Sequence, residues 1–180
     1  MKQNYIVFCF LIGISFLSFS QKEAEKTSGI FYKLSLATTL TINKDYTLGN
    51  DEGETFINPS ALFVNNTVGY QFDQRSLIGL NFEYDWHSQQ GLHFAPAFLS
   101  FQYNVITDDT NLFLRSGYGT LLGLGKSFEK GNMYRLGVGI EDVYFDTSFL
   151  FGLDFTRKRF GYKTLEGISS VSIFLEFKFF

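Results

Sequence analysis

The feature that most constrains this chain is a two-residue alternation of apolar and polar side chains that recurs along almost its whole length. The segment from Ile78 to His87 shows it most sharply, because Ile, Leu, Phe, Tyr and Trp alternate there with Gly, Asn, Glu, Asp and His. Successive side chains of a strand point to opposite faces, so the pattern predicts β-structure. No stretch shows a convincing 3.6-residue repeat, and the sequence therefore predicts an all-β protein.

The alternation divides the chain into eight segments, an even number that suits up-and-down closure. We expect strands at Ile30–Ile42, Ser60–Asp73, Leu77–His87, His93–Val105, Leu112–Leu122, Met133–Glu141, Thr147–Thr156 and Ile168–Phe179. In the fourth segment Leu92 and Phe94 occupy one register and the apolar residues from Leu99 onward the other. This switch predicts a β-bulge near Pro96, because a bulge tolerates a residue without an N–H.

Volume and charge indicate which face of the sheet is inside. An eight-stranded barrel has just enough room for side chains, and roughly 40 mostly large apolar residues, at ~5 per strand, would overfill it. The less apolar face carries glycines and nine charged residues that can pair in a small lumen: Lys33, Glu83, Asp85, Arg115, Arg135, Glu141, Asp154, Glu176 and Lys178. Tyrosines and Trp86 lie on the apolar face, several near strand ends, as the interfacial girdles of membrane barrels require. We therefore predict a closed antiparallel eight-stranded up-and-down transmembrane β-barrel, whose first and last strands pair because no backbone group can remain unpaired in lipid.

The connections support this orientation. Asn43–Pro59, Gly123–Gly131 and Arg157–Gly167 are long and alternate with short turns, although Ser88–Gly91 in the same set is short. Long extracellular loops and short periplasmic turns are typical of outer-membrane barrels.

The N-terminus predicts export. Residues 1–20 read as a signal peptide, with Lys2 before an apolar stretch and with Ser18 and Ser20 at the −3 and −1 positions. We expect residues 21–28 to form a short periplasmic lead and residues 29–180 the outer-membrane barrel domain. Cys9 is the only cysteine, so the mature chain would hold no disulfide or cysteine-bound metal. Removing Lys2 from the 15 basic residues leaves 14 against 18 acidic ones, a net charge of −4 that disfavours a nucleic-acid partner.

The C-terminal sequence Ile173-Phe174-Leu175-Glu176-Phe177-Lys178-Phe179-Phe180, together with the signal peptide and the eight alternating segments, resembles the small outer-membrane β-barrel family typified by OmpX and the OmpA membrane domain. The resemblance implies location in the outer membrane of a diderm (Gram-negative) bacterium, contact with outer-membrane lipids and lipopolysaccharide, and recognition by the barrel-assembly machinery through Phe177, Phe179 and Phe180. The outward apolar set ends at Phe179 and not at the terminal Phe180, one residue out of the usual register. We expect no peptidoglycan-binding domain after the barrel, so the resemblance does not imply wall tethering.

Two loops carry opposite charge. Asn43–Pro59 has one basic and four acidic residues, whereas Arg157–Gly167 has Arg157, Lys158, Arg159 and Lys163 against one acidic residue. We interpret the second as an extracellular basic loop. One interpretation is that it covers the barrel mouth together with the acidic loop. Another is that it contacts lipopolysaccharide phosphates, and both can hold at once.

Four local patterns suggest chemistry, but each has a simpler structural explanation. Gly119–Ser127 approaches a phosphate-binding loop without its first glycine or a following helix. His87 and Ser88 resemble an acyl-transfer pair, yet adjacent strand residues point to opposite faces. Asp51, Glu52 and Glu54 do not match the calcium-loop spacing, and His87 and His93 lack a third metal ligand. We therefore expect no catalytic, cofactor-binding or metal-binding residues.

Three classes of function remain open. The leading one is a non-enzymatic envelope or surface-interaction role, including membership of a larger outer-membrane complex. The alternatives are a narrow channel for small or apolar solutes and a lipid A-modifying enzyme. A soluble lipocalin-like carrier is a minor fourth reading.

Overall fold

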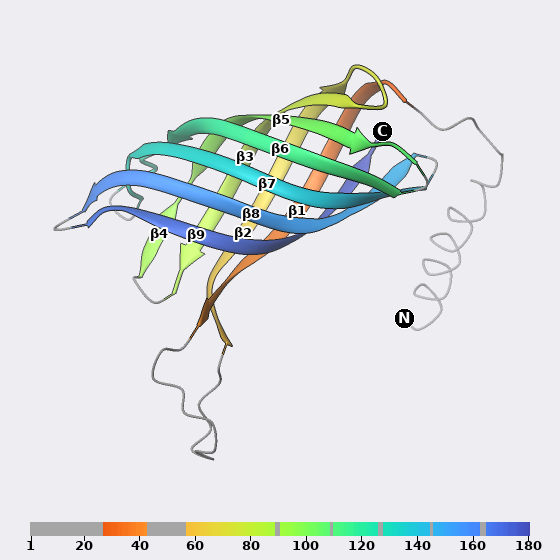
Figure 1. Cartoon of the computed structure of the whole chain (residues 1–180). Coiled ribbons are helices and arrows are strands. Elements are labelled where there is room, and N and C mark those ends of the chain that lie inside the picture. Colours follow the sequence, from red (N-terminus) through yellow and green to blue (C-terminus); the bar gives the residue numbers. More distant parts are fainter. Residues whose placement is uncertain are drawn as a thin grey trace, which may run out of the picture.

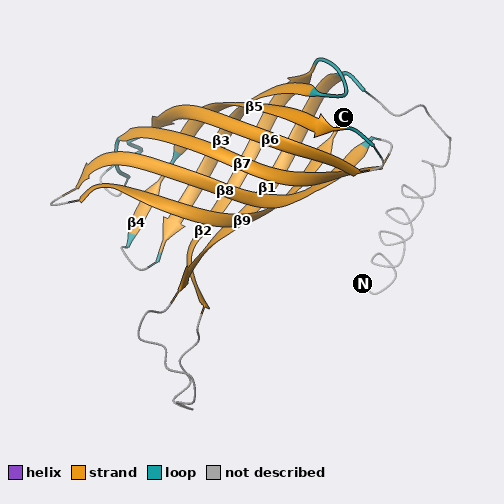
Figure 2. Ribbon diagram, viewed as in Figure 1, coloured by secondary structure: helices purple, strands orange, loops and turns teal. Residues whose placement is uncertain are grey.

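The computed structural model describes residues 27–42, 57–88, 91–108, 110–125, 128–144, 146–162 and 165–180. These ranges contain nine β-strands: β1 (Gly29–Ile42), β2 (Ile57–Gln71), β3 (Ser76–His87), β4 (Leu92–Phe94), β5 (Pro96–Ile106), β6 (Thr110–Leu121), β7 (Gly131–Tyr144), β8 (Thr147–Tyr162) and β9 (Leu165–Phe179). The strands form one tilted, twisted wall around a central axis (Figures 1 and 2). Within the same ranges, no helix is long and apolar enough to cross a membrane.

The sheet closes on itself. Each strand pairs with its sequence neighbour, and β1 pairs with both β2 and β9, so that Tyr32 lies between Val68 and Phe179. β4 and β5 both pair with β3 and together make one wall strand, which gives eight positions around the barrel. The predicted eight-stranded antiparallel closure, with pairing of the first and last strands, is confirmed.

The two ends of the barrel differ. The strand ends that flank residues 43–56, 88–91, 122–130 and 163–164 lie at one end of the barrel, which we call the loop end. The strand ends that flank residues 72–75, 107–109 and 145–146 lie at the other, the turn end, together with the start of β1 and the C-terminus (Figure 1).

The predicted bulge near Pro96 is wrong. Phe94 lies opposite Asp85, and Ala97 lies opposite Phe82, so β4 and β5 keep one register on β3 and no residue is inserted. The ladder is interrupted at Ala95 because Pro96 has no N–H to donate. Phe94 is fully buried inside the barrel, so the apolar residues of β4 are a lumen layer and not a shifted part of the lipid face. A register shift does occur between β1 and β2, at Thr39/Leu40.

The last hairpin is longer than expected. β8 runs to Tyr162, and Arg157 and Arg159 pair with Ser169 and Gly167 of β9. Arg157, Lys158 and Arg159 are therefore strand residues and do not belong to the loop that their composition suggested.

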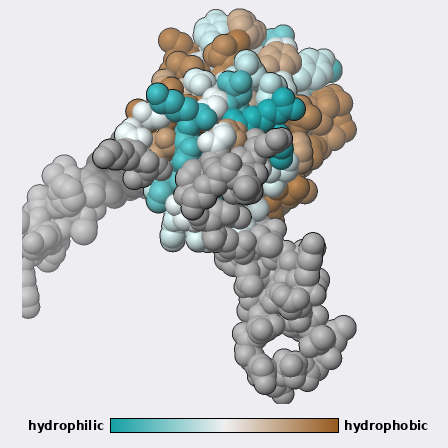
Figure 3. Space-filling view, turned by 90° about the vertical axis from the view of Figure 1, so that its left-hand side faces the viewer, coloured by the Kyte–Doolittle hydropathy of each residue, from teal (hydrophilic) through white to brown (hydrophobic). Residues whose placement is uncertain are grey.

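The exterior is a coat of exposed apolar side chains. On β8 it comprises Phe149, Phe151, Leu153 and Phe155, which are 36–48% exposed, and the outward residues of β3 and β9 continue it. Seen from the loop end, hydrophilic residues gather in the middle and hydrophobic residues lie along the upper and right-hand edges (Figure 3). A closed sheet with an apolar outside and a charged inside is the arrangement of a transmembrane β-barrel.

Candidate functional site

Among the residues that the structure describes, ten charged side chains, each at most 10% exposed, lie inside the barrel, and seven ion pairs connect them. Five are basic (Lys33, Arg115, Arg135, Lys158 and Lys178) and five are acidic (Glu83, Asp85, Glu141, Asp154 and Glu176). We call them the lumen network. It contains the nine predicted lumen residues and adds Lys158, which balances the charge.

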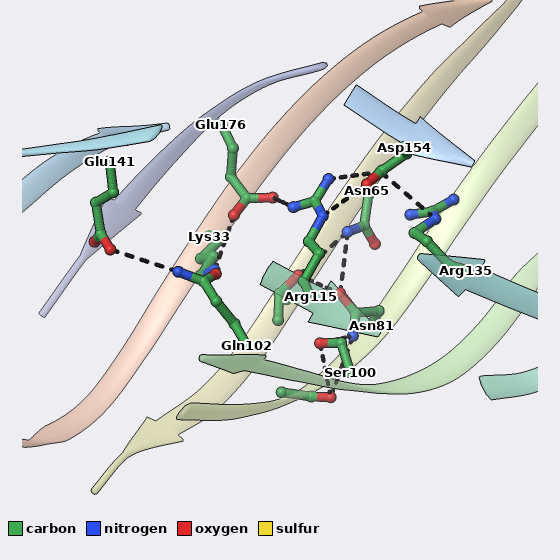
Figure 4. Close-up of polar contacts among 12 residues, drawn as sticks. Lys33, Asn65, Asn81, Ser100, Gln102, Arg115, Arg135, Glu141, Asp154 and Glu176 are labelled. Atoms are coloured by element: carbon green, nitrogen blue, oxygen red, sulfur yellow. Dashed lines mark hydrogen bonds and ion pairs between the residues drawn. The ribbon is translucent and has the colours of Figure 1, made fainter. Parts of the chain in front are cut away.

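Arg115 of β6 is at the centre of the network. Its Nε and Nη2 donate to the two oxygens of Asp154 at 2.8 and 2.6 Å, and its Nη1 donates to Oε2 of Glu176 at 3.1 Å. The guanidinium carbon also lies 3.6 Å from the centre of the Phe174 ring. Arg115 thereby connects β6 to both β8 and β9 inside the lumen (Figure 4).

The network extends from Arg115 in both directions. Lys33 of β1 pairs with Oε1 of Glu176 at 2.9 Å. On the other side Nε of Arg135 lies 3.7 Å from Oδ2 of Asp154. Nη1 and Nη2 of Arg135 donate to the two oxygens of Glu83 at 2.7 and 2.6 Å. Basic and acidic groups therefore alternate across the barrel, and bidentate geometry of this kind gives strong, directional pairing.

A shorter polar group lies toward the turn end. Lys178 of β9 donates to Glu141 and, at 3.1 Å, to Oε1 of Gln71. The Gln102 amide accepts a hydrogen bond from Lys33 at 2.9 Å and donates to Glu141 at 3.5 Å. This amide connects the turn-end pair to the central network.

Toward the loop end, Lys158 of β8 is 1% exposed. Its Nζ lies 2.6 Å from Oδ2 of Asp85 and 3.3 Å from Nε2 of His87. The rings of Phe63 and Phe94 lie 4.5 and 5.3 Å from the ammonium. With a strand expected only to Thr156, Lys158 is expected in the following loop, whereas it lies in β8. Two further residues of the same alternation would have placed Lys158 on the face that carries Asp154.

An apolar layer closes the lumen beyond Lys158. Its members are Leu92, Phe94, Phe98, Leu121, Met133 and Phe160. The sequence does not predict this layer, because large apolar residues are expected on the lipid face. Between the side chains at the centre of the lumen a cavity of about 20 Å³ remains, space for little more than a single water. At the turn end a wider recess of about 480 Å³ is lined by Gln71, Asn111 and Lys178. In the described part of the chain, side chains therefore fill the centre of the lumen.

Where the structure describes them, the local patterns with possible chemistry take ordinary structural roles. The His87 ring is inside the barrel, whereas the exposed Ser88 donates its hydroxyl to the Ser60 carbonyl oxygen, so the two side chains do not act together. His93 shares a 2.8 Å hydrogen bond with the Tyr84 hydroxyl. Among the described residues, no group of three or more metal-ligating side chains occurs. Gly119 lies within β6, which runs to Leu121, but Lys126 and Ser127 lie outside the described ranges, as do Asp51, Glu52 and Glu54.

The predicted assembly residues occupy two faces. Phe177 and Phe179 point outward, 50% and 43% exposed. Phe180 follows β9 at the turn end, where its ring packs edge-on against Phe31 at 6.5 Å and its N–H donates to the Asp146 carbonyl oxygen.

The residues of the predicted basic loop also divide between two faces. Arg157 and Arg159 point outward on β8, on either side of the inward Lys158. Lys163 and the acidic loop residues lie outside the described part of the chain, and the expected lid lies there with them.

No protein-family model matches the chain, and no curated protein matches it. Solved structures do match. The crystal structure of Neisserial surface protein A (NspA) has a TM-score of 0.62 at 11% identity, over 86% of this chain and 99% of that one. The N-terminal β-barrel domain of Pseudomonas aeruginosa OprF has a TM-score of 0.53 at 10% identity, over 86% of this chain and all of that domain. At such identities the likeness concerns the fold, and the protein is a transmembrane β-barrel with the fold of the small outer-membrane barrels.

Proposed function

We propose that the protein is an integral outer-membrane barrel with a non-enzymatic role at the cell surface, exerted by the loop end and not by the lumen. The filled lumen carries this proposal. Five buried cations neutralise five buried anions, and the apolar layer covers them. A lumen whose centre is filled serves to hold the wall strands together and leaves the loops as the surface for interaction.

Planar-bilayer recordings test the closed lumen directly. Folded protein, identified by its faster migration on unheated gels, should insert without producing discrete conductance steps. Heat-denatured protein serves as the control for membrane leakage. Reproducible ohmic steps that appear only with the folded protein would refute the closed lumen and favour the channel alternative.

The non-enzymatic part has a separate test. Lipid A from cells with and without the gene should show the same mass spectrum. A mass shift that depends on the gene, and that survives replacement of residues 44–56 by a short turn, would favour a lipid A-modifying enzyme instead.

A further inference from the structure

The outer face of the barrel carries two arginines at the loop-end edge of its apolar coat. Arg157 and Arg159 are two residues apart on β8, so their side chains leave the same face about 6–7 Å apart along the strand. Toward the turn end, the same face of β8 carries Phe155, Leu153, Phe151 and Phe149, followed by Thr147 at the start of the strand. The eight residue steps from Phe149 to Arg157 rise about 20 Å along a strand tilted by ~40°, close to the ~25 Å height of the apolar band. The two guanidinium groups are therefore at head-group depth.

Neighbouring side chains hold both arginines without neutralising them. Nη1 of Arg157 donates to the Ser169 hydroxyl at 2.9 Å, and the Arg159 guanidinium carbon lies 5.9 Å from the centre of the Tyr134 ring. Their cross-strand partners are Asn132, Tyr134, Gly167 and Ser169, none of which is acidic. Within the described ranges neither arginine forms an ion pair, which contrasts with the full pairing of every charge inside the lumen.

A hollow interrupts the apolar coat next to these arginines. It has a volume of about 390 Å³ and is lined by Ser116 and Gly117 of β6, among others. Ser116 is a small outward residue between the larger outward Leu114 and Tyr118. The walls of the hollow include Leu99, Phe101, Leu136 and Tyr134. Tyr134 thus lines the hollow and also contacts Arg159. The volume lies within the ~300–1,000 Å³ range of small-molecule sites.

We propose that Arg157, Arg159 and the hollow at Ser116 form a binding site for a phosphate-bearing membrane lipid. The guanidinium groups recognise phosphate oxygens, which they match in charge and in planar donor geometry. The hollow receives part of an acyl chain. The inference rests on the proposed outer-membrane location, with the loop end at the cell surface and its rim in the outer leaflet. It requires neither a closed lumen nor an interaction of the loops with a partner.

Binding to purified, folded protein in non-ionic detergent tests the site. The probes are diphosphorylated lipid A, its monophosphorylated form and inorganic phosphate, with affinities measured by native mass spectrometry and calorimetry. The double variant Arg157→Gln/Arg159→Gln should weaken diphosphorylated lipid A binding about tenfold or more, because each basic group near a lipid surface contributes about 1 kcal/mol. Arg75→Gln is the matched control, since Arg75 is an exposed arginine in the turn at the opposite end, and it should leave the affinity unchanged.

Ser116→Leu separates the two parts of the site. It should fill the hollow and weaken lipid A binding severalfold without affecting weak binding of inorganic phosphate. The proposal is overturned if the double variant keeps wild-type lipid affinity, or if Arg75→Gln reduces that affinity equally. Displacement of lipid A by millimolar inorganic phosphate would show a free-anion site and overturn the lipid assignment. Migration on unheated gels verifies that each variant is folded. If the barrel conducts ions, the closed lumen is refuted, but the expected lipid A affinities of these variants do not change.

Discussion

Single residues inside this barrel are stabilised by partners from other strands. Arg135 of β7 holds Glu83 of β3 through two hydrogen bonds in a buried setting. Removing one member of such a pair leaves an uncompensated buried charge, which costs far more than removing both. The strength of the pair is therefore measured by comparing single and double variants.

We predict that Arg135→Met lowers the free energy of unfolding by about 3–5 kcal/mol, because Glu83 loses its bidentate partner. The double variant Glu83→Gln/Arg135→Met should lose clearly less. Urea unfolding of the protein in lipid bilayers, followed by Trp86 fluorescence, measures both. Equal losses in the single and double variants would show that the two residues are not coupled.

Asp73 provides a pH-dependent contact in the turn between β2 and β3. Its Oδ1 accepts hydrogen bonds from the backbone N–H groups of Arg75 and Ser76 at 2.8 and 2.6 Å, and these bonds lower the pKa of the carboxyl group. The contact therefore stabilises the folded state fully above the pKa of the unfolded chain, and this stabilisation is lost as the pH falls through the lower folded pKa.

We expect the amide resonances of Arg75 and Ser76 to titrate together with a midpoint below ~3.9, the ordinary value for aspartate. NMR of the protein in detergent micelles checks this. Asp73→Ala should abolish the titration, and a midpoint at or above the ordinary value would contradict the contact.

At the scale of the strands, packing requires glycine at one inward position of β8. A Cβ on Gly152 would lie 2.2 Å from the Val138 carbonyl oxygen and 2.6 Å from the Gly139 Cα, both backbone atoms of β7. We predict that Gly152→Ala costs about 1–3 kcal/mol through overpacking. Gly161→Ala, also in β8, is the control, because a Cβ there meets nothing within 4 Å. Denaturant midpoints compare the two variants, and equal midpoints would contradict the clash.

The outward face of β1 tests membrane insertion. Leu34 is 43% exposed and Ile30, on the same face near the turn end, is 70% exposed. Leu34→Arg should cost ~2–4 kcal/mol at mid-bilayer depth, whereas Ile30→Arg, near the interface, should cost ~0–1 kcal/mol. Unfolding titrations in bilayers measure the difference. A Leu34→Arg protein as stable as Ile30→Arg would contradict the assigned depth.

The sequence predicted the strands well because their alternation reports a local property, the face to which each side chain points. It was less successful where two environments accept the same residue type. Phe94 and Phe98 are apolar but point inward, and hydropathy does not distinguish a lumen layer from lipid. Lys158 was misassigned because a run of three basic residues resembles a solvated loop until its pairing with Asp85 is known.

At the scale of the whole molecule, closure depends on β1 and β9, the strands farthest apart in sequence. Leu36 lies opposite Leu175 in this seam, and Phe151 lies opposite Leu175 on the far side of β9. We predict that a Leu36→Cys/Leu175→Cys protein forms an intramolecular disulfide on mild oxidation. A Leu36→Cys/Phe151→Cys protein should not, because two strand spacings of ~4.8 Å exceed the reach of a disulfide. Gel mobility with and without reductant distinguishes them, and no crosslink in the first variant would contradict closure.

The even balance of the lumen network also restricts how such a protein can change over generations. A lumen charge such as Glu83 or Arg135 can be replaced only when its partner changes too, so these positions should covary in pairs. Outward positions need only remain apolar, and one aliphatic or aromatic residue can replace another freely. Two barrels of this kind can therefore keep one shape while retaining about a tenth of their residues in common, as the 11% identity to the Neisserial protein illustrates.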